Sequence, residues 1–423
     1  MAYDIEEIRS HFPSLQSGAI FFDNPGGTQV PQEVIDAVAE YYKTSNSNSH
    51  GAFATSQRTD AVLSQGRAAL ADFLNAASPN EIVFGPNMTT LTFNISRALG
   101  RLFDEGDEII VTRLDHDADI APWLALEERG AVIRWVDIHP DDCTLDMADF
   151  EKHLSTKTKI VAVGGASNAV GSMNDLKTII PLAHMAGALV FVDAVHLAPH
   201  EPIDAQDLDC DLLACSVYKF YGPHLGVLYG KYDLLDRLPA YKVRPSGKNP
   251  PDKFETGTQN HEAIAGARAA IDYLASVGDK YGAPYSERFK AFTGRRMRLK
   301  TAMAAIKAYE RDLFTRLMSG LRDIPGIQTY GIAETGRFGY RTPTVAFTLE
   351  GHRSRDLQRD KTPREIAERL GRNHIYVWDG NYYALALMER LGLEEHGGAV
   401  RVGLAHYNTA AEVDRFLQVM EKI

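Results

Sequence analysis

Lys219 is a candidate nucleophile of this sequence. It stands in Ser216-Val-Tyr-Lys219-Phe-Tyr-Gly-Pro223, directly after an apolar, strand-like run. Burial at such a position would lower the pKa of the amine, and a neutral amine can attack a carbonyl carbon and then serve as a base. Considered alone, Lys219 is better explained as a lysine that buries its stem and keeps its ammonium in water.

A carboxylate and two hydroxyls also follow strand-like runs. Asp193 ends Leu189-Val-Phe-Val-Asp193, and open parallel sheets bind ligands at the carboxyl ends of their strands, although Asp there is equally expected as a helix N-cap. Thr89 and Thr90 lie in Gly85-Pro-Asn-Met-Thr-Thr90, between a strand pattern and a helix pattern. Hydroxyls and free N–H groups at a helix start bind anions, but threonine also caps helices without a ligand, and this segment is no nucleotide P-loop.

His116 lies among three carboxylates in Asp115-His116-Asp117-Ala-Asp119. The cluster could suggest a metal site, but no HxxxH pair or second dense His/Asp group supports one, so we expect no metal. An imidazole at the end of a strand can instead stack on a planar cofactor ring. Pyridoxal phosphate (PLP) chemistry requires an anion site, a stacking ring, a carboxylate and a lysine that burial could activate, and this sequence offers all four.

Composition limits the other functions. The chain has 423 residues and a formal net charge of −11, from 45 Lys+Arg and 56 Asp+Glu. An acidic chain is a poor partner for nucleic acid, which binds clustered Lys/Arg. No apolar run approaches the roughly 20 residues of a membrane span, and the acidic N-terminus lacks a secretory pattern. We therefore expect a cytoplasmic globular protein that binds neither nucleic acid nor membrane.

The elements that would position these residues alternate between strand and helix patterns. Seven apolar runs predict strands, namely 81–84, 107–112, 132–136, 159–163, 189–192, 212–216 and 226–229. Helix patterns lie between them at 31–42, 59–74, 122–128 and 176–185, and a long charged one covers 285–321. Near-continuous apolar strands that alternate with helices predict an α/β domain with a mainly parallel sheet. The basic run 295–300 is expected on a solvated helix face.

The rest of the chain predicts a smaller α+β unit. Strand patterns occur at 344–348, 375–378 and 399–402, helix patterns at 363–370 and 409–423, and a polar stretch at 351–361. We expect residues 1–20 to pack against this small domain, residues 21–285 to form the large domain, and residues 286–423 to form the small one.

The sequence resembles the class V aminotransferases, and among them the cysteine desulfurase/selenocysteine lyase group. The resemblance covers nearly the whole chain in order, and it is carried by Phe22-Asp-Asn-Pro-Gly-Gly27, Met88-Thr-Thr90 with Asn94, Asp115-His116 through Pro122-Trp123, Ser167-Asn168-Ala-Val-Gly171, Val192-Asp-Ala-Val-His196, Ser216-Val-Tyr-Lys219-Phe-Tyr-Gly-Pro223, Phe254-Glu-Thr-Gly-Thr258-Gln-Asn260 and Arg401-Val-Gly-Leu-Ala-His-Tyr-Asn408. It implies the fold type I of PLP enzymes and a homodimer.

The resemblance also implies roles for single residues. Lys219 would form the Schiff base with PLP, His116 would stack on its ring, and Asp193 would pair with the ring nitrogen. Asn168 and His196 would lie near the ring hydroxyl, while Thr89, Thr90, Ser216 and Tyr218 would hold the phosphate. Thr258 would reach the phosphate of the neighbouring subunit's cofactor. Arg401 would bind the substrate α-carboxylate, where a guanidinium fork fits two oxygens, and Asn24, His50 and Tyr383 would face the substrate.

Three departures from the family pattern bear on the reaction. Cysteine desulfurases carry a loop cysteine that accepts sulfur about twenty residues before the carboxylate-binding arginine, but here that region is Trp378-Asp-Gly-Asn-Tyr-Tyr383. The three cysteines, Cys143, Cys210 and Cys215, lie elsewhere. Tyr218 replaces the usual histidine before the lysine, and Ser49-His-Gly-Ala52 lacks an arginine.

These observations favour a PLP enzyme that acts on a small α-amino acid. β-Elimination of the C–S or C–Se lyase type, without a persulfide cysteine, is the first expectation. Transamination, or racemisation or epimerisation, remains an alternative. A protein that keeps the fold as a non-catalytic binding module is the non-enzymatic alternative, although the joint presence of Lys219, Asp193, His116 and Arg401 argues against it.

Overall fold

The computed structural model describes residues 3–349 and 362–423. A seven-stranded sheet forms the centre of the larger part of the chain, with the strand order β2-β10-β9-β8-β7-β3-β4. Its strands are β2 (Ile82–Gly85), β3 (Glu108–Thr112), β4 (Val132–Val136), β7 (Thr158–Gly164), β8 (Leu189–Asp193), β9 (Leu212–Ser216) and β10 (Gly226–Gly230). Strand β10 runs antiparallel to both neighbours, and the pairs from β9 to β4 are parallel. The predicted mainly parallel seven-stranded α/β sheet is confirmed.

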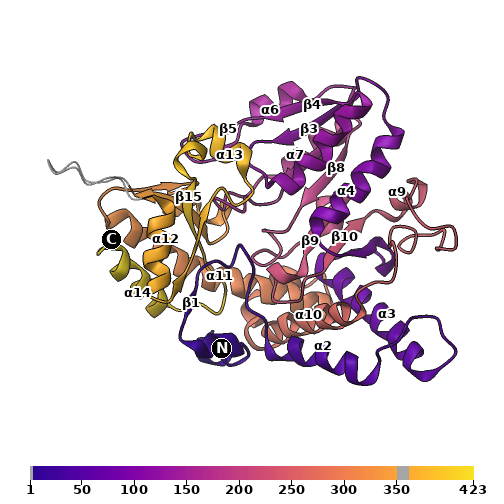
Figure 1. Cartoon of the computed structure of the whole chain (residues 1–423), viewed down its shortest axis with the longest axis horizontal. Coiled ribbons are helices and arrows are strands. Elements are labelled where there is room, and N and C mark those ends of the chain that lie inside the picture. The colour runs from indigo at the N-terminus through magenta and orange to yellow at the C-terminus, as the bar shows by residue number, and fades with distance from the viewer. Residues whose placement is uncertain (1–2, 350–361) are drawn as a thin grey trace.

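Helices cover both faces of this sheet, which explains why most positions in the middle of its strands are apolar. Along β8, Val190 and Val192 belong to one core and Phe191 to the other. The first core includes side chains of α3 (Ala54–Leu74), α6 (Met147–His153), α7 (Leu176–Met185) and α10 (His261–Tyr281). The second includes those of α4 (Met88–Leu99), α5 (Ala121–Leu124) and α9 (Tyr232–Arg237). Figure 1 shows α4 and α10 on opposite sides of the strands.

A four-stranded antiparallel sheet forms the centre of the smaller part, with the order β11-β12-β15-β14. Its strands are β11 (Ile327–Tyr330), β12 (Thr344–Leu349), β14 (Trp378–Gly380) and β15 (Ala399–Gly403). Side chains of α11 (Gly294–Asp323), α12 (Pro363–Arg372) and α14 (Ala410–Met420) share its core. Helix α11 joins the two parts, because Ile306 belongs to the large-domain core and Leu317 to the small-domain core.

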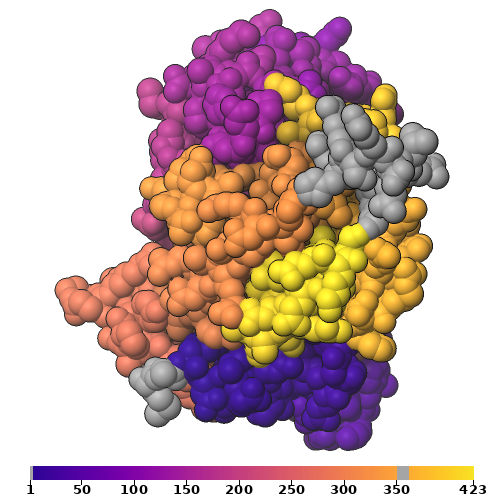
Figure 2. Space-filling model, turned by 90° about the vertical axis from the view of Figure 1, so that its left-hand side faces the viewer, coloured from indigo at the N-terminus to yellow at the C-terminus, as the bar shows by residue number. Residues whose placement is uncertain are grey.

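The remaining elements are short or peripheral. They are α1 (Ile5–Ser10), α2 (Gln32–Thr44), α8 (Ala205–Leu208), α13 (Leu385–Arg390), β1 (Ile20–Phe21), β5 (Ile138–His139), β6 (Thr144–Leu145) and β13 (Ile375–Tyr376). Strand β1 pairs with β13 in parallel and so attaches the N-terminal segment to the small domain. Arg9 adds an ion pair to Glu412 at 2.9 Å, and Figure 2 shows the N-terminal segment beside the C-terminal helix. Glu7, however, also bonds Tyr281 of α10 at 2.8 Å, so this segment contacts both parts. The domain limits stay a prediction.

Two predicted helices differ from those observed. The pattern over 285–321 suggests one helix, but 3₁₀ turns at Ala283–Tyr285 and Glu287–Phe289 come first, and α11 begins only at Gly294, whose positive φ of 58° separates it from the preceding turns. The pattern over 122–128 becomes the single turn of α5 and a 3₁₀ turn, Ala125–Arg129, which ends at Gly130 with φ 87°. The polar stretch 351–361 lies outside the described residues.

The sequence suggested that the basic run 295–300 lies on a solvated helix face. This prediction is wrong. Arg296 donates to Asp72 at 3.0 Å and to Asn75 at 2.6 Å, both near the end of α3. Lys300 is fully buried, and its ammonium donates to the carbonyl of Ile203. The run therefore joins α11 to the large domain through hydrogen bonds and ion pairs.

Candidate active site

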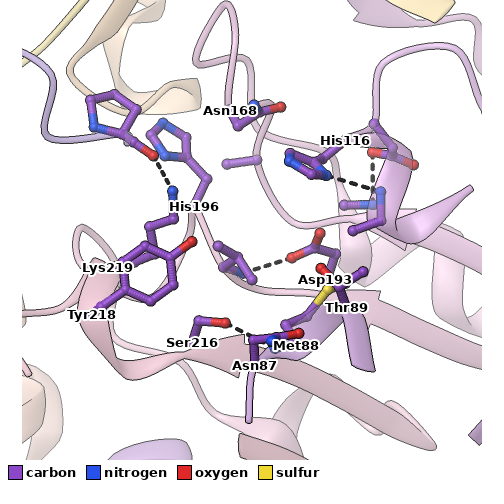
Figure 3. A pocket seen from close by; sticks show the side chains of 16 residues that line it. Asn87, Met88, Thr89, His116, Asn168, Asp193, His196, Ser216, Tyr218 and Lys219 are labelled. Atoms are coloured by element: carbon purple, nitrogen blue, oxygen red, sulfur yellow. Dashed lines mark hydrogen bonds between the residues drawn. The ribbon is translucent and has the colours of Figure 1, made fainter. Parts of the chain in front are cut away.

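A cavity lies at the carboxyl ends of the parallel strands, where an open α/β sheet is expected to bind its ligand. We call it the inner cavity. Its walls include loop residues after β2, β3, β7, β8 and β9. Figure 3 draws its sixteen lining residues around a common space and labels ten of them, Asn87, Met88, Thr89, His116, Asn168, Asp193, His196, Ser216, Tyr218 and Lys219. The structure thus brings together most of the cofactor residues that the sequence suggested.

Lys219 follows β9 in a short 3₁₀ turn, Val217–Lys219. Its amine donates to the carbonyls of Pro25 and Gly26, the latter at 3.1 Å, and it lies 4.9 Å from the centre of the Tyr218 ring. Burial and the nearby Arg401 guanidinium lower the pKa of Lys219 to about 7. A large share of Lys219 is therefore neutral at physiological pH, which is the state that a nucleophilic lysine needs.

Asp193 ends β8 and is buried. Its carboxylate accepts a hydrogen bond from the Val195 amide at 2.8 Å, and burial raises its pKa to about 6. A buried carboxylate of raised pKa gains from a cationic hydrogen-bond donor such as a protonated ring nitrogen. Asp115 behind it accepts from Gly164 N at 2.9 Å and Thr112 Oγ1 at 2.7 Å, and burial raises its pKa to about 7.

His116 follows β3 and presents its ring to both the inner cavity and the surface outside it. Its Nδ1 accepts a hydrogen bond from the Ala118 amide at 2.9 Å, and burial lowers its pKa to about 4. The imidazole is therefore neutral, which suits a ring that stacks on a planar cofactor. The Tyr383 ring stacks on His116, with 5.5 Å between the ring centres and 21° between the planes.

The start of α4 supplies the anion-binding end of the inner cavity. Asn87 caps the helix by accepting from Thr90 N at 2.8 Å, and Ser216 Oγ accepts from Met88 N at 3.0 Å. Thr89 lines the cavity, as does Ser216, so backbone N–H groups and hydroxyls converge there. Thr90 does not line it. It borders a separate cavity of about 300 Å³ together with Thr258 and His224.

Asn168 lines the inner cavity, and its neighbour Arg401 lines the outer cavity described below. Arg401 comes from β15 and donates to Asp23 Oδ1 at 2.8 Å and to Asn168 O at 3.1 Å, and its guanidinium lies 4.5 Å from the centre of the Tyr382 ring. Arg401 Nε and Asn168 Oδ1 are buried without a hydrogen-bond partner among the described residues. Such atoms are costly unless a ligand satisfies them, so the site fits a polar cofactor and an anionic substrate group.

A second and larger cavity, of about 670 Å³, opens outward from the first, and we call it the outer cavity. Lys219, His116, Tyr218, Thr89 and Asn168 line both. The remaining walls of the outer cavity come from loops of both domains and from α4, β14 and β15, and they include Asp23, Phe93, Asp117, Trp378, Tyr382, Tyr383 and Arg401. Its volume is within the range typical of sites for ligands larger than a small amino acid.

The segment 380–383 gives the outer cavity a fixed shape. Tyr382 and Tyr383 have φ angles of 56° and 59°. Two successive tyrosines in the left-handed region are costly, and such strain is typical of functional sites. The segment is held by Asn168 Nδ2, which donates to Tyr382 O at 2.8 Å, and by Asp117 N, which donates to Tyr383 O at 2.6 Å. These two bonds connect it to loops of the large domain, so both tyrosines stay in the wall of the outer cavity.

Three residues expected near the substrate lie in different surroundings. Tyr383 lines the outer cavity, with 72% of its surface exposed. Asn24 is buried and lines neither cavity, because its amide donates to Gly403 O at 2.8 Å and Asn408 Oδ1 at 3.0 Å and so ties the 20s loop to β15. His50 lines neither cavity either, and 88% of its side chain is exposed, near Asp60. Of these three residues, Tyr383 is the one that lines a cavity of the described chain, and its contact with the substrate stays a prediction.

His196 and Tyr218 have neighbours that sequence reasoning did not suggest. His196 Nε2 lies 3.1 Å from both Thr342 Oγ1 and Thr344 Oγ1, and burial lowers its pKa. Tyr218 stacks on His224, with 4.7 Å between the ring centres. Both side chains line the inner cavity.

Sequence reasoning missed several residues of the outer cavity, above all Asp23, Phe93, Asp117, Trp378 and Tyr382. Asp117 belongs to the Asp115–Asp119 run, for which the sequence suggested only an unsupported metal site. Among the described residues, no group of three His, Cys, Asp or Glu side chains is placed to hold a metal ion. Asp23 is adjacent to Asn24 in the sequence, but its partner Arg401 is 378 residues away. No local sequence pattern reveals an ion pair over that separation.

The three cysteines lie away from both cavities. Cys143, Cys210 and Cys215 are fully buried and belong to the core that α3 and α10 cover. Burial raises the pKa of Cys143 to about 11 and that of Cys210 to about 12, and it raises the pKa of Cys215 as well. Thiols in this state are poor nucleophiles.

Comparison with known proteins identifies the family. The model of the family described as aminotransferase class V matches residues 20–299 and 293–416. The chain belongs to the class V aminotransferase family. A cysteine desulfurase of Pectobacterium atrosepticum is 32% identical over 444 residues, which cover 100% of this chain and 98% of the relative. An aminotransferase-like protein of Gibberella zeae is 32% identical over 432 residues, with 100% and 99% covered.

Solved structures of the family share the fold. The apo structure of a cysteine desulfurase from Thermococcus onnurineus has a TM-score of 0.84 and 28% identity, with 99% of this chain and 97% of that chain covered. This class V enzyme is thus PLP-dependent and cysteine desulfurase-like, with the fold type I that the sequence predicted. No helix among residues 3–349 and 362–423 is both long and apolar enough to cross a membrane.

The residues present fit PLP, which supplies an electron sink for the α-carbon of an amino acid. Lys219 would bond to the aldehyde carbon, and His116 would stack on the ring. Asp193 would pair with the ring nitrogen and keep it protonated. The α4 start with Thr89 and Ser216 would hold the phosphate. Asn168 Oδ1, which has no other partner among the described residues, would accept a hydrogen bond at the ring hydroxyl side.

Proposed function

We propose that this enzyme removes a substituent from the β-carbon of an α-amino acid, as a C–S or C–Se lyase that needs no persulfide cysteine. The main support for the proposal is the set of chemical groups that line the two cavities. They contain an amine of lowered pKa, a buried carboxylate and an arginine, but no thiol among their described lining residues. The residues at the position of the family's sulfur-accepting loop are 378–383, and the three cysteines are buried elsewhere.

The residues of the chain divide the work of such an elimination. Arg401 binds the α-carboxylate, for which it must share or exchange its present partner Asp23. The neutral Lys219 amine takes the proton from the α-carbon. The C–S bond then breaks with its electron pair on sulfur, which leaves as a thiol after taking up a proton. The released 2-aminoacrylate reacts with water to give pyruvate and ammonia, so no sulfur acceptor and no oxidant are required.

The proposal also includes the assembly and the location expected from the sequence. We infer a homodimer in which Thr258 reaches the neighbouring subunit's cofactor. Thr258 supports this, because it is exposed in the single chain and lines the 300 Å³ cavity beside Thr90, outside the inner cavity. Sedimentation velocity of the purified enzyme should give twice the mass of the chain. A cytoplasmic location stays a prediction.

A single-turnover assay tests the reaction. With the holoenzyme in excess over L-cysteine or an S-alkyl-L-cysteine, we expect one pyruvate per substrate and a cofactor spectrum that returns to that of the aldehyde form. Stoichiometric pyridoxamine phosphate would show transamination instead, and interconversion of the L and D amino acids would show racemisation. Alanine together with enzyme-bound sulfur would show persulfide chemistry and overturn the proposal.

Alkylation provides a control that does not alter the fold. Because burial raises the pKa of Cys143, Cys210 and Cys215 and removes them from solvent, iodoacetamide should leave the native enzyme unlabelled and fully active. Labelling after denaturation should modify all three thiols. Loss of pyruvate formation in step with labelling of the native enzyme would show that a thiol takes part.

A further inference from the structure

Asp117 is a charged residue of the outer cavity that the proposed elimination does not use. It is half-buried, and among the described residues its carboxylate has neither a hydrogen-bond donor nor an ion-pair partner. Burial raises the pKa of this carboxyl from its ordinary value. A partly desolvated carboxylate gains free energy when a ligand brings a cationic hydrogen-bond donor to it.

The other charges of the outer cavity already have partners or tasks. Arg401 pairs with Asp23 at 2.8 Å and is the group suited to an α-carboxylate. Lys219 donates to the carbonyls of Pro25 and Gly26 and is the group suited to the cofactor. A substrate carboxylate that occupies Arg401 adds a negative charge to the cavity and leaves Asp117 without a positive partner. With such a substrate bound, Asp117 is the charged group of the outer cavity that still lacks an opposite charge among the described lining residues.

Aromatic rings border the same space. Trp378 and Tyr383 line the outer cavity and are 55% and 72% exposed. Among the described residues, neither ring is covered by a lysine or arginine, whereas the Tyr382 ring carries the Arg401 guanidinium at 4.5 Å. The faces of tryptophan and tyrosine attract cations. Tyr383 is also fixed next to Asp117, since Asp117 N donates to Tyr383 O at 2.6 Å.

We propose that the substrate is an α-amino acid whose side chain ends in a cation, an ammonium or a guanidinium, which pairs with Asp117 beside the rings of Trp378 and Tyr383. This inference rests on the proposed function in one respect, namely that the substrate is an α-amino acid whose carboxylate binds Arg401. It replaces the small amino acid expected from the sequence with a longer, basic one. The volume of about 670 Å³ leaves room for such a side chain.

Binding of amino acids without a leaving group tests the substrate class independently of elimination. The holoenzyme is titrated with L-lysine and with L-norleucine, which differ in the terminal ammonium, while the absorbance of the bound cofactor is recorded. We expect lysine to bind about tenfold more tightly, because its ammonium can pair with the partly buried Asp117 carboxylate, which norleucine cannot do. Equal affinities overturn the proposal, as does the failure of both amino acids to change the spectrum.

Substitution of Asp117 assigns the preference to this residue. Asp117→Asn should bring the affinity for lysine down to that for norleucine and leave the affinity for norleucine unchanged. Asp117→Glu should keep part of the preference. The matched control is Asp312→Asn, which removes an exposed carboxylate of α11 that lines neither cavity. A lysine preference that persists in Asp117→Asn, or that disappears in Asp312→Asn, overturns the assignment.

Turnover of two thioethers separates this inference from the proposed function. S-(2-aminoethyl)-L-cysteine carries a terminal ammonium, and S-propyl-L-cysteine carries a methyl group in its place. We expect kcat/KM for pyruvate formation to be about tenfold higher for the first. Equal rates would retain elimination and overturn the basic substrate. A lysine preference in the titration without pyruvate from either thioether would retain the basic substrate and overturn elimination.

Discussion

The inner and outer cavities are built in different ways. The inner cavity lies at the ends of the parallel strands. Among its ionisable groups, Asp193 ends β8 and Lys219 lies in the turn that follows β9. The outer cavity is bordered by segments of both domains, and its loop residues Tyr382 and Tyr383 have strained backbone conformations. The strand ends can thus position a cofactor in any enzyme of the family, while the loops are free to define the substrate.

Replacement of Lys219 should have the largest effect, because Lys219 borders both cavities. Lys219→Ala removes the group that bonds the cofactor and takes the α-proton, and we expect kcat to fall by about 10³-fold or more. The absorbance of the covalently held cofactor should disappear. Thermal unfolding of the apo variant, within a few degrees of the parent, is the control for folding. A variant that keeps its activity would remove Lys219 from the chemistry.

Replacement of Asp193 should affect the inner cavity alone. Asp193→Asn keeps the size of the side chain but cannot hold a proton on the ring nitrogen as a carboxylate does, so we expect kcat to fall by about 100-fold. KM for the amino acid should change little, because Asp193 does not line the outer cavity. Steady-state kinetics measure both quantities. A change confined to KM would contradict the separation of the two cavities.

The rate of cofactor attachment should depend on pH through Lys219. Its pKa is lowered to about 7 from an ordinary 10.5, and the neutral amine is the reactive form, so the rate should rise with pH and level off above about 7. Between pH 5 and 7 the neutral fraction grows about fiftyfold. Stopped-flow absorbance after mixing apoenzyme with PLP measures the rate, and N-acetyl-lysine amide is the control. A rate that rises up to pH 10, as for the model amine, would show that burial does not activate Lys219.

Replacement of Arg401 should affect the outer cavity more than the inner one. Arg401→Lys keeps the charge but loses the fork that fits two carboxylate oxygens, and we expect KM to rise about tenfold. The absorbance of the bound cofactor should be unchanged. Amino acids and their amides, which lack the carboxylate, serve as paired substrates. A parent enzyme that binds both equally well would contradict the role of Arg401.

The difference between the cavities also explains what could be predicted from the sequence. The sheet could be predicted from apolar runs that are covered on both faces. Lys219, Asp193 and His116 could be selected because they lie at or shortly after the ends of those runs. The outer cavity depends on long-range contacts, such as Arg401 with Asp23 and Asp117 with Tyr383. Asn24 shows the limit clearly, because its neighbour Asp23 lines the cavity while Asn24 bonds Gly403 and Asn408. Only the backbone conformation of this turn decides whether Asp23 or Asn24 points toward the substrate.

Replacement of Tyr383 should have the smallest effect and should show how strongly the cavities are coupled. Its ring stacks on His116 at 5.5 Å and also borders the outer cavity. Tyr383→Ala removes a stacking contact of about 0.5–1.5 kcal/mol, so we expect KM to rise about threefold and kcat to stay within about twofold. Tyr383→Phe, which keeps the ring, should behave like the parent. A large fall of kcat in Tyr383→Ala, with normal kinetics in Tyr383→Phe, would show instead that the ring holds His116 against the cofactor and that the outer loop controls the chemistry of the inner cavity.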